Sequence, residues 1–176
     1  MKTELSALML TVPLALITLT GCSMTDDDTQ AIPSAGTSTS RDASDSMERV
    51  SSSIYDLIGI AGKASDSRPT VTDCGGKDAG TYFRILHPWS FTPATEGDLE
   101  VAMKRLKVEL PKNGWKVVHY GPDTSKNKNI SLTADNDAKK VSVKVIAMAK
   151  DDPPMLTLDV ISGCYKVPEG QEVERF

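Results

Sequence analysis

Histidine is the side chain best suited to moving protons near neutral pH, and this chain has two, His87 and His119. Each lies among apolar residues in a segment whose alternating pattern predicts a β-strand. A catalytic pair would require the fold to bring such residues together with a carboxylate. We interpret both as structural histidines of a sheet, and the catalytic pair is the alternative.

Other patterns that could support catalysis are incomplete. The chain has neither Gly-x-Ser-x-Gly nor His-Glu-x-x-His. Residues 59–65 look like a phosphate-binding loop, but Leu57 occupies the place of its first glycine and Ala64 replaces its Ser or Thr. Asp135 and Asp137 have the spacing of a calcium loop without its later glycine and glutamate. The sequence therefore predicts no catalytic, cofactor-binding or metal-binding residues.

Two tryptophans, Trp89 and Trp115, lie in predicted strands, where packing in the core is their usual role. Trp89 follows Pro88, and proline in a strand indicates an end or an edge of a sheet. Trp89 and the neighbouring Phe91 are therefore the candidate contacts with a ligand or a protein partner.

The N-terminus has the layout of an export signal. Residues 5–19 are uncharged and mostly apolar, and Lys2 precedes them. Fifteen residues are too few for a membrane-spanning helix, which needs roughly 20, but they suit a signal peptide over residues 1–21. The run ends in Leu19-Thr20-Gly21-Cys22, which resembles the lipobox of bacterial lipoprotein precursors. The resemblance implies cleavage before Cys22, a lipid on its thiol, and a protein anchored to the outer face of the cell membrane.

The next segment, residues 22–46, is predicted to be the lipidated cysteine followed by a flexible acidic tether. It is rich in Ser, Thr and Asp and has few aliphatic side chains, so it offers little apolar surface to offset the entropy of ordering. Its five Asp and one Arg account for the net charge of −4 of the 176-residue chain. Residues 47–176 are then neutral, which argues against a nucleic-acid partner.

With Cys22 assigned to lipid, Cys74 and Cys164 remain in a protein exported from the reducing cytosol. An even pair outside the cell predicts one disulfide bond. A metal pair or a redox couple is the alternative, but the chain has no Cys-x-x-Cys.

Residues 47–176 are predicted to form one α+β domain with a frayed C-terminal tail from residue 167. Helical spacing of apolar residues predicts helices over 47–61 and 96–110, the second capped by Thr95 and ended by Pro111. Alternating patterns predict the strands 81–91, 115–120, 129–134, 141–149 and 155–162, with a further short strand near Val71. Short connections favour antiparallel neighbours. We expect two helices packed on one face of a mostly antiparallel sheet of about five strands.

The mature chain also looks like small, uncharacterised envelope lipoproteins of actinobacteria. The features that carry this resemblance are the lipobox, the tether, Asn113-Gly114-Trp115-Lys116-Val117 and Ser162-Gly163-Cys164-Tyr165. The resemblance implies no particular activity. The sequence therefore predicts a membrane-anchored binding or interaction module without catalysis or cofactor. An envelope protein or an apolar small ligand is the expected partner, with a carrier of such a ligand or a secreted envelope hydrolase as the alternatives.

Overall fold

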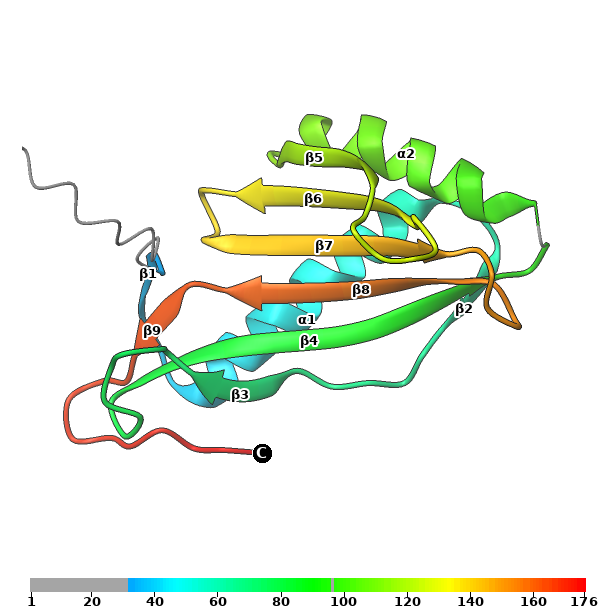
Figure 1. Cartoon of the computed structure of the whole chain (residues 1–176). Helices are drawn as coiled ribbons and strands as arrows, with labels where there is room; N and C mark the ends of the chain where they lie inside the picture. Colours follow the sequence, from blue (N-terminus) through cyan, green and yellow to red (C-terminus); the bar gives the residue numbers. More distant parts are fainter. Residues whose placement is uncertain (1–31, 96) are drawn as a thin grey trace, which may run out of the picture. The chain divides into compact units, whose positions relative to one another are not determined.

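The computed structural model describes residues 32–95 and 97–176, which form two helices and nine strands (Figure 1). In chain order the elements are β1 Ser34–Thr37, α1 Ser40–Ile58, β2 Gly62–Ala64, β3 Thr70–Asp73, β4 Tyr82–Pro93, α2 Asp98–Lys112, β5 Lys116–Pro122, β6 Ile130–Asn136, β7 Val141–Met148, β8 Met155–Ser162 and β9 Cys164–Lys166.

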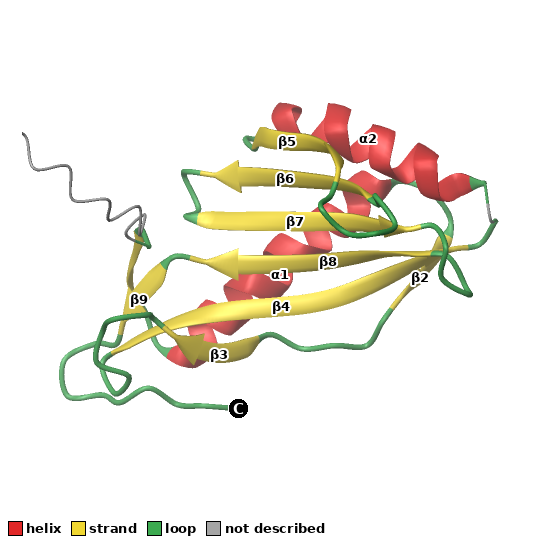
Figure 2. Cartoon of the chain, in the orientation of Figure 1, coloured by secondary structure: helices red, strands yellow, loops and turns green. Residues whose placement is uncertain are grey.

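The strands form one curled sheet in the order β1-β9-β4-β8-β7-β6-β5, and β2 and β3 pair in addition with β4 (Figure 2). The sheet is mixed, because β1 runs parallel to β9 while the other pairings are antiparallel. The expected α+β class is confirmed, but the prediction of about five mostly antiparallel strands was wrong. The strands it missed are three or four residues long, too short to display an alternating pattern.

Both helices cover the same face of the sheet. Cross-strand partners on that face run from Ala134 through Val143 and Val160 to His87, and all four side chains are buried. α1 contacts β4 and β8, α2 contacts β5, β6 and β7, and the two helices contact each other. The core is therefore a single layer between the helices and the sheet.

The first helix begins earlier than residue 47. Thr39 caps α1, with its hydroxyl oxygen accepting a hydrogen bond from the backbone N of Asp42 at 3.1 Å. The first two turns bury small side chains, including Ala43 and Ser44, which a search for large apolar residues overlooks. The helix ends at Ile58, because Gly59 adopts the left-handed conformation with φ 60°.

The predicted boundary between tether and domain is therefore wrong as well. Residues 34–37 and 40–46, assigned to the tether, belong to β1 and to the first turns of α1. β1 is held by β9, and the backbone N of Cys164 donates to the carbonyl of Pro33 at 2.8 Å. The signal segment, the lipobox and Cys22 lie outside the described residues.

The second helix is shifted by two residues from its prediction. Its N-cap residue is Gly97, and no side chain makes a capping hydrogen bond there. Thr95 is therefore not the cap. Pro111 lies within the last turn rather than beyond it. Gly114 adopts φ 81° and turns the chain into β5. In the described residues, neither helix is both long and apolar enough to span a bilayer.

The predicted disulfide is confirmed. Cys74, in the turn after β3, is bonded to Cys164 at the start of β9, with 5.8 Å between the Cα atoms. Both cysteines are buried. The bridge connects the edge formed by β3 to the strand that also holds β1.

The C-terminal tail is docked on the domain, contrary to the prediction that it frays. Val167 is buried, and the backbone N of Val173 donates to the carbonyl of Gly80 at 3.1 Å. The guanidinium of Arg41 pairs with the carboxylate of Glu174. These partners come from α1 and from the turn before β4, and a reading of local pattern alone could not anticipate them.

Candidate functional site

The edge strand beside β4 is irregular at one point. β2 pairs as far as Ala64 with Phe91, and β3 resumes the pairing at Thr70 with Leu86. Residues 65–69 therefore lie opposite residues 87–90 of β4, so the edge strand has one extra residue here. This is the arrangement of a β-bulge.

Pro88 accounts for the position of this bulge. Ser90, two residues further on, faces the edge strand: its carbonyl accepts from the N of Ser65 at 2.9 Å, and its N donates to the Oγ of Ser65 at 3.0 Å. Alternate residues of a strand direct their backbone groups to the same side, so the nitrogen of Pro88 also faces the bulged segment. Proline has no N–H to donate, and the ladder is interrupted there. The expectation that Pro88 ends the strand or places it at an edge was wrong, because β4 runs through Pro88 and pairs with β8 on one side and with β2 and β3 on the other.

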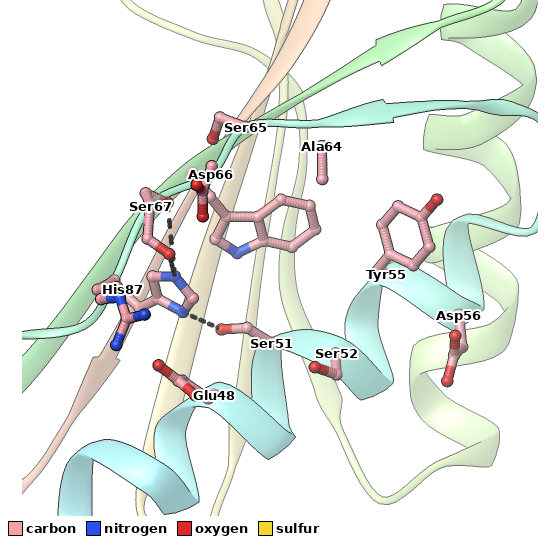
Figure 3. Close-up of a pocket in the computed structure, with 12 residues that line it drawn as sticks. Glu48, Ser51, Ser52, Tyr55, Asp56, Ala64, Ser65, Asp66, Ser67 and His87 are labelled. Carbon is pink, nitrogen blue, oxygen red and sulfur yellow. Dashed lines mark hydrogen bonds between the residues drawn. The ribbon is translucent and has the colours of Figure 1, made fainter. Parts of the chain in front are cut away.

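The bulge leaves a cavity of about 460 Å³ between α1, residues 64–68 and β4 (Figure 3). We call it the polar cavity, because serine hydroxyls and charged groups make up most of its wall. Its lining residues are Glu48, Ser51, Ser52, Tyr55, Asp56, Ala64, Ser65, Asp66, Ser67, Arg68, His87 and Trp89.

His87 connects the two walls of the polar cavity and is 7% exposed. Its Nε2 lies 3.1 Å from the carbonyl oxygen of Ser67, and its Nδ1 lies 2.9 Å from the Oγ of Ser51 (Figure 3). A carbonyl oxygen can only accept, so Nε2 carries the proton and Nδ1 accepts from the Ser51 hydroxyl. Burial lowers the pKa of His87, against the opposing effects of the Ser67 carbonyl and the charge of Glu48. The ring is therefore neutral near pH 7.

A serine hydroxyl that donates to a neutral imidazole nitrogen, as Ser51 does to His87, is the arrangement of a nucleophile and its general base. The third partner is a backbone carbonyl, however, and no carboxylate in the described residues is hydrogen-bonded to the ring. Ser51 is also 5% exposed. The pair is better suited to holding α1 against the bulged segment than to attacking a substrate.

Trp89 is the predicted contact residue that reaches the polar cavity. It is 8% exposed, and its Nε1 is buried without a hydrogen-bond partner in the described residues. The Tyr55 ring lies 6.4 Å from it between centroids. Phe91, the other predicted contact, is fully buried, does not line the cavity, and packs edge-on against Tyr55 at 5.8 Å.

The charged groups around the polar cavity are exposed and unpaired within the described residues. Glu48, Asp56 and Asp66 supply three carboxylates and Arg68 supplies one cation, and none of the four makes an ion pair there. These side chains are free to contact an incoming ligand. No sequence pattern indicated these residues, because Glu48 and Asp66 come from segments that meet only in the folded chain.

The remaining candidate residues are elsewhere. His119 is exposed on β5, which β8, β7 and β6 separate from β4, so the structure does not bring the two histidines together. Asp135 and Asp137 lie at the end of β6 and the turn that follows. Within residues 32–95 and 97–176, no group of three or more His, Cys, Asp or Glu is placed to hold a metal ion.

Comparisons with protein-family models, with curated proteins and with solved structures found no match for this chain. A proposal for its function therefore has to rest on the geometry of the domain.

Proposed function

We propose that the chain is a non-catalytic binding module, anchored by lipid at the outer face of the cell membrane, which takes a small polar ligand into the polar cavity. Small-molecule sites commonly have volumes of about 300–1,000 Å³ and combine aromatic walls with a few converging polar groups. The polar cavity fits this description, with Tyr55 and Trp89 beside the hydroxyls of Ser51 and Ser52.

The observation that carries the proposal is the unpartnered Nε1–H of Trp89 in the cavity wall. A buried donor without an acceptor costs roughly 1–3 kcal/mol, and native proteins rarely leave one without cause. A ligand oxygen entering from the cavity would supply the missing acceptor after a small shift of the ring. The preformed contact between His87 of β4 and Ser51 of α1 would hold the two walls of the cavity together.

The test is to isolate the full chain from the membranes of the cells that produce it and to identify the extracted small molecules by mass spectrometry. Ser52→Trp fills the mouth of the cavity from an exposed position on α1. Arg49→Trp adds the same bulk at an exposed site on this helix that does not line the cavity. We expect one compound to accompany the wild type and Arg49→Trp and to be absent from Ser52→Trp. The same set of compounds from all three proteins would refute the proposal.

The location rests on the N-terminal sequence, and Cys22→Ala tests it. The lipid chains would hold the protein to the membrane because each buried CH₂ contributes about 0.8 kcal/mol. We expect the variant to leave the membrane fraction or to keep its signal segment. A processed variant that stays in that fraction would contradict the lipid anchor.

A further inference from the structure

A second cavity, of about 820 Å³, lies between α2, β5–β6 and the connection from β7 to β8. We call it the apolar cavity. Figure 1 shows the start of α2 and the β5–β6 and β7–β8 connections at the same end of the sheet. None of the residues that line it lines the polar cavity, so an occupant here is a question separate from the proposed function.

The floor of the apolar cavity is built from the core. Leu99 and Met103 of α2 are 5% and 1% exposed, and Ala147 of β7 is 7% exposed. At the mouth, Ile130 is 39% exposed and belongs to the few large apolar side chains on the described surface. A hydrocarbon group that enters here would be removed from water, first by packing against Ile130 and then against the side chains of the floor.

The charges at the rim have the opposite sign from the polar cavity. Lys104, Lys128 and Lys150 line the apolar cavity together with one carboxylate, Glu100. Glu100 is 2.6 Å from the Nζ of Lys104 and is therefore already paired. In the described residues, Lys128 and Lys150 have no carboxylate within 4.0 Å. Two ammonium groups are thus available beside an open apolar floor.

We propose that the apolar cavity binds a single-chain anionic amphiphile, with the hydrocarbon chain on Met103 and Ile130 and the anionic headgroup at Lys128 and Lys150. The apolar floor selects a hydrocarbon chain, and the lysines select a negative charge at one end of it. A carboxylate and a phosphate offer this same chemistry, since an ammonium group acts on either as a point charge.

The test is calorimetric titration of the protein with dodecanoate, dodecyl phosphate and dodecyltrimethylammonium, each below its micelle concentration, together with NMR mapping of the contacted residues. We expect saturable 1:1 binding of the two anions and at least tenfold weaker binding of the cation. Decanoate should bind more weakly than dodecanoate by roughly threefold to fourfold for each CH₂ removed. Tighter dodecanoate than dodecyl phosphate would indicate a fatty acid as the natural occupant, and the reverse order would indicate a phosphorylated one. Equal binding of anion and cation, or no saturable binding, would overturn the proposal.

Matched variants locate the site. Ile130→Asp places a carboxylate at the mouth and should weaken dodecanoate binding at least tenfold, whereas Val108→Asp, at a 53% exposed position of α2 outside the cavity, should not change it. Replacing both Lys128 and Lys150 by Gln should remove the preference for anions and leave the dependence on chain length. Ser52→Trp should leave dodecanoate binding intact, which separates this result from the fate of the polar cavity. Unchanged binding by Ile130→Asp would refute the location.

Discussion

The Nδ1 atom of His87 accepts a hydrogen bond from the hydroxyl of Ser51 at 2.9 Å, although 36 residues separate the two in the chain. The contact joins β4, which lies beside the bulged residues 65–69, to α1. It depends on Ser67, whose carbonyl oxygen fixes the proton on Nε2. Three segments therefore meet at one neutral imidazole, and we expect protonation of that ring to weaken the contact between them.

His87 should make the protein less stable in mild acid. Burial lowers its folded-state pKa below the ordinary value of 6.5, so the unfolded chain binds more protons as the pH falls through about 6.5. The stabilising contribution is complete above that value and is lost as the pH falls toward the folded-state pKa. Urea denaturation at about pH 7.5 and about pH 5.5 measures the change. We expect His87→Gln to reduce the pH dependence and the exposed His119→Gln to retain it. Equal pH dependence in all three proteins would show that His87 does not contribute.

Ser51 should act as a structural donor and not as a nucleophile. Ser51→Ala removes the partner of a buried ring nitrogen and should lower the free energy of unfolding by about 1–3 kcal/mol. Ser52→Ala, exposed on the next position of α1, should change it by less than about 0.5 kcal/mol. A fluorophosphonate probe, which labels activated serines, should leave the wild type unmodified in intact-mass spectra. An adduct on Ser51 would support the envelope hydrolase instead.

Much of the fold could be predicted because large apolar residues recur at regular spacing. The spacing located both helices, and β8 was predicted with its observed bounds, Met155–Ser162. The pattern failed where small residues do the packing, as at Ala43 in α1, and where a strand is held by distant partners, as with β1 on β9. Neither feature produces a periodic pattern of large apolar residues in the sequence.

The polar cavity could be predicted only in part. Pro88 led us to propose the neighbouring Trp89 as a contact residue, and Trp89 does line the cavity, as does His87, which was predicted to be structural. Ser51 and Ser67 gave no signal, because the register of β3 on β4 and the docking of α1 bring them to His87. Such long-range placement follows from packing of the whole domain.

The Cys74–Cys164 bridge should contribute strongly to stability, because it closes a loop with a sequence separation of 90. In the chain-entropy model such a loop is worth about 4–5 kcal/mol. We expect the double variant Cys74→Ser/Cys164→Ser to unfold at lower urea concentration by a corresponding margin. Reduced wild-type protein should behave like this variant. A double variant as stable as the oxidised wild type would contradict the entropic estimate.

Gly163 should be intolerant of a side chain. A Cβ there would collide with the backbone carbonyl of Pro33, the atom that accepts from the N of Cys164. We expect Gly163→Ala to lower the free energy of unfolding by roughly 1–3 kcal/mol through displacement of β1. Gly75→Ala, where a Cβ meets nothing within 4 Å, is the matched control. Thermal unfolding of the two variants side by side gives the comparison.

The residues before Met47 should be required for a stable domain. A chain beginning at Met47 loses β1, the Thr39 cap and the first two turns of α1, along with the buried side chain of Ala43. It also loses the hydrogen bond from the backbone N of Glu174 to the Oγ of Ser40 at 3.1 Å. The C-terminal tail therefore loses one of its attachments to α1. We expect its Tm to lie about 10 °C or more below that of a chain beginning at Ile32.

Calorimetry of these two chains distinguishes a folded start near residue 34 from a tether that extends to residue 46. Because the tail is anchored on the same turn of α1, the shorter chain should also show faster amide exchange at Val173, whose N–H is bonded to the Gly80 carbonyl. A chain beginning at Met47 with the Tm of the longer one would mean that β1 and the start of α1 contribute nothing to stability. Faster exchange at Val173 with an unchanged Tm would confine their role to holding the tail.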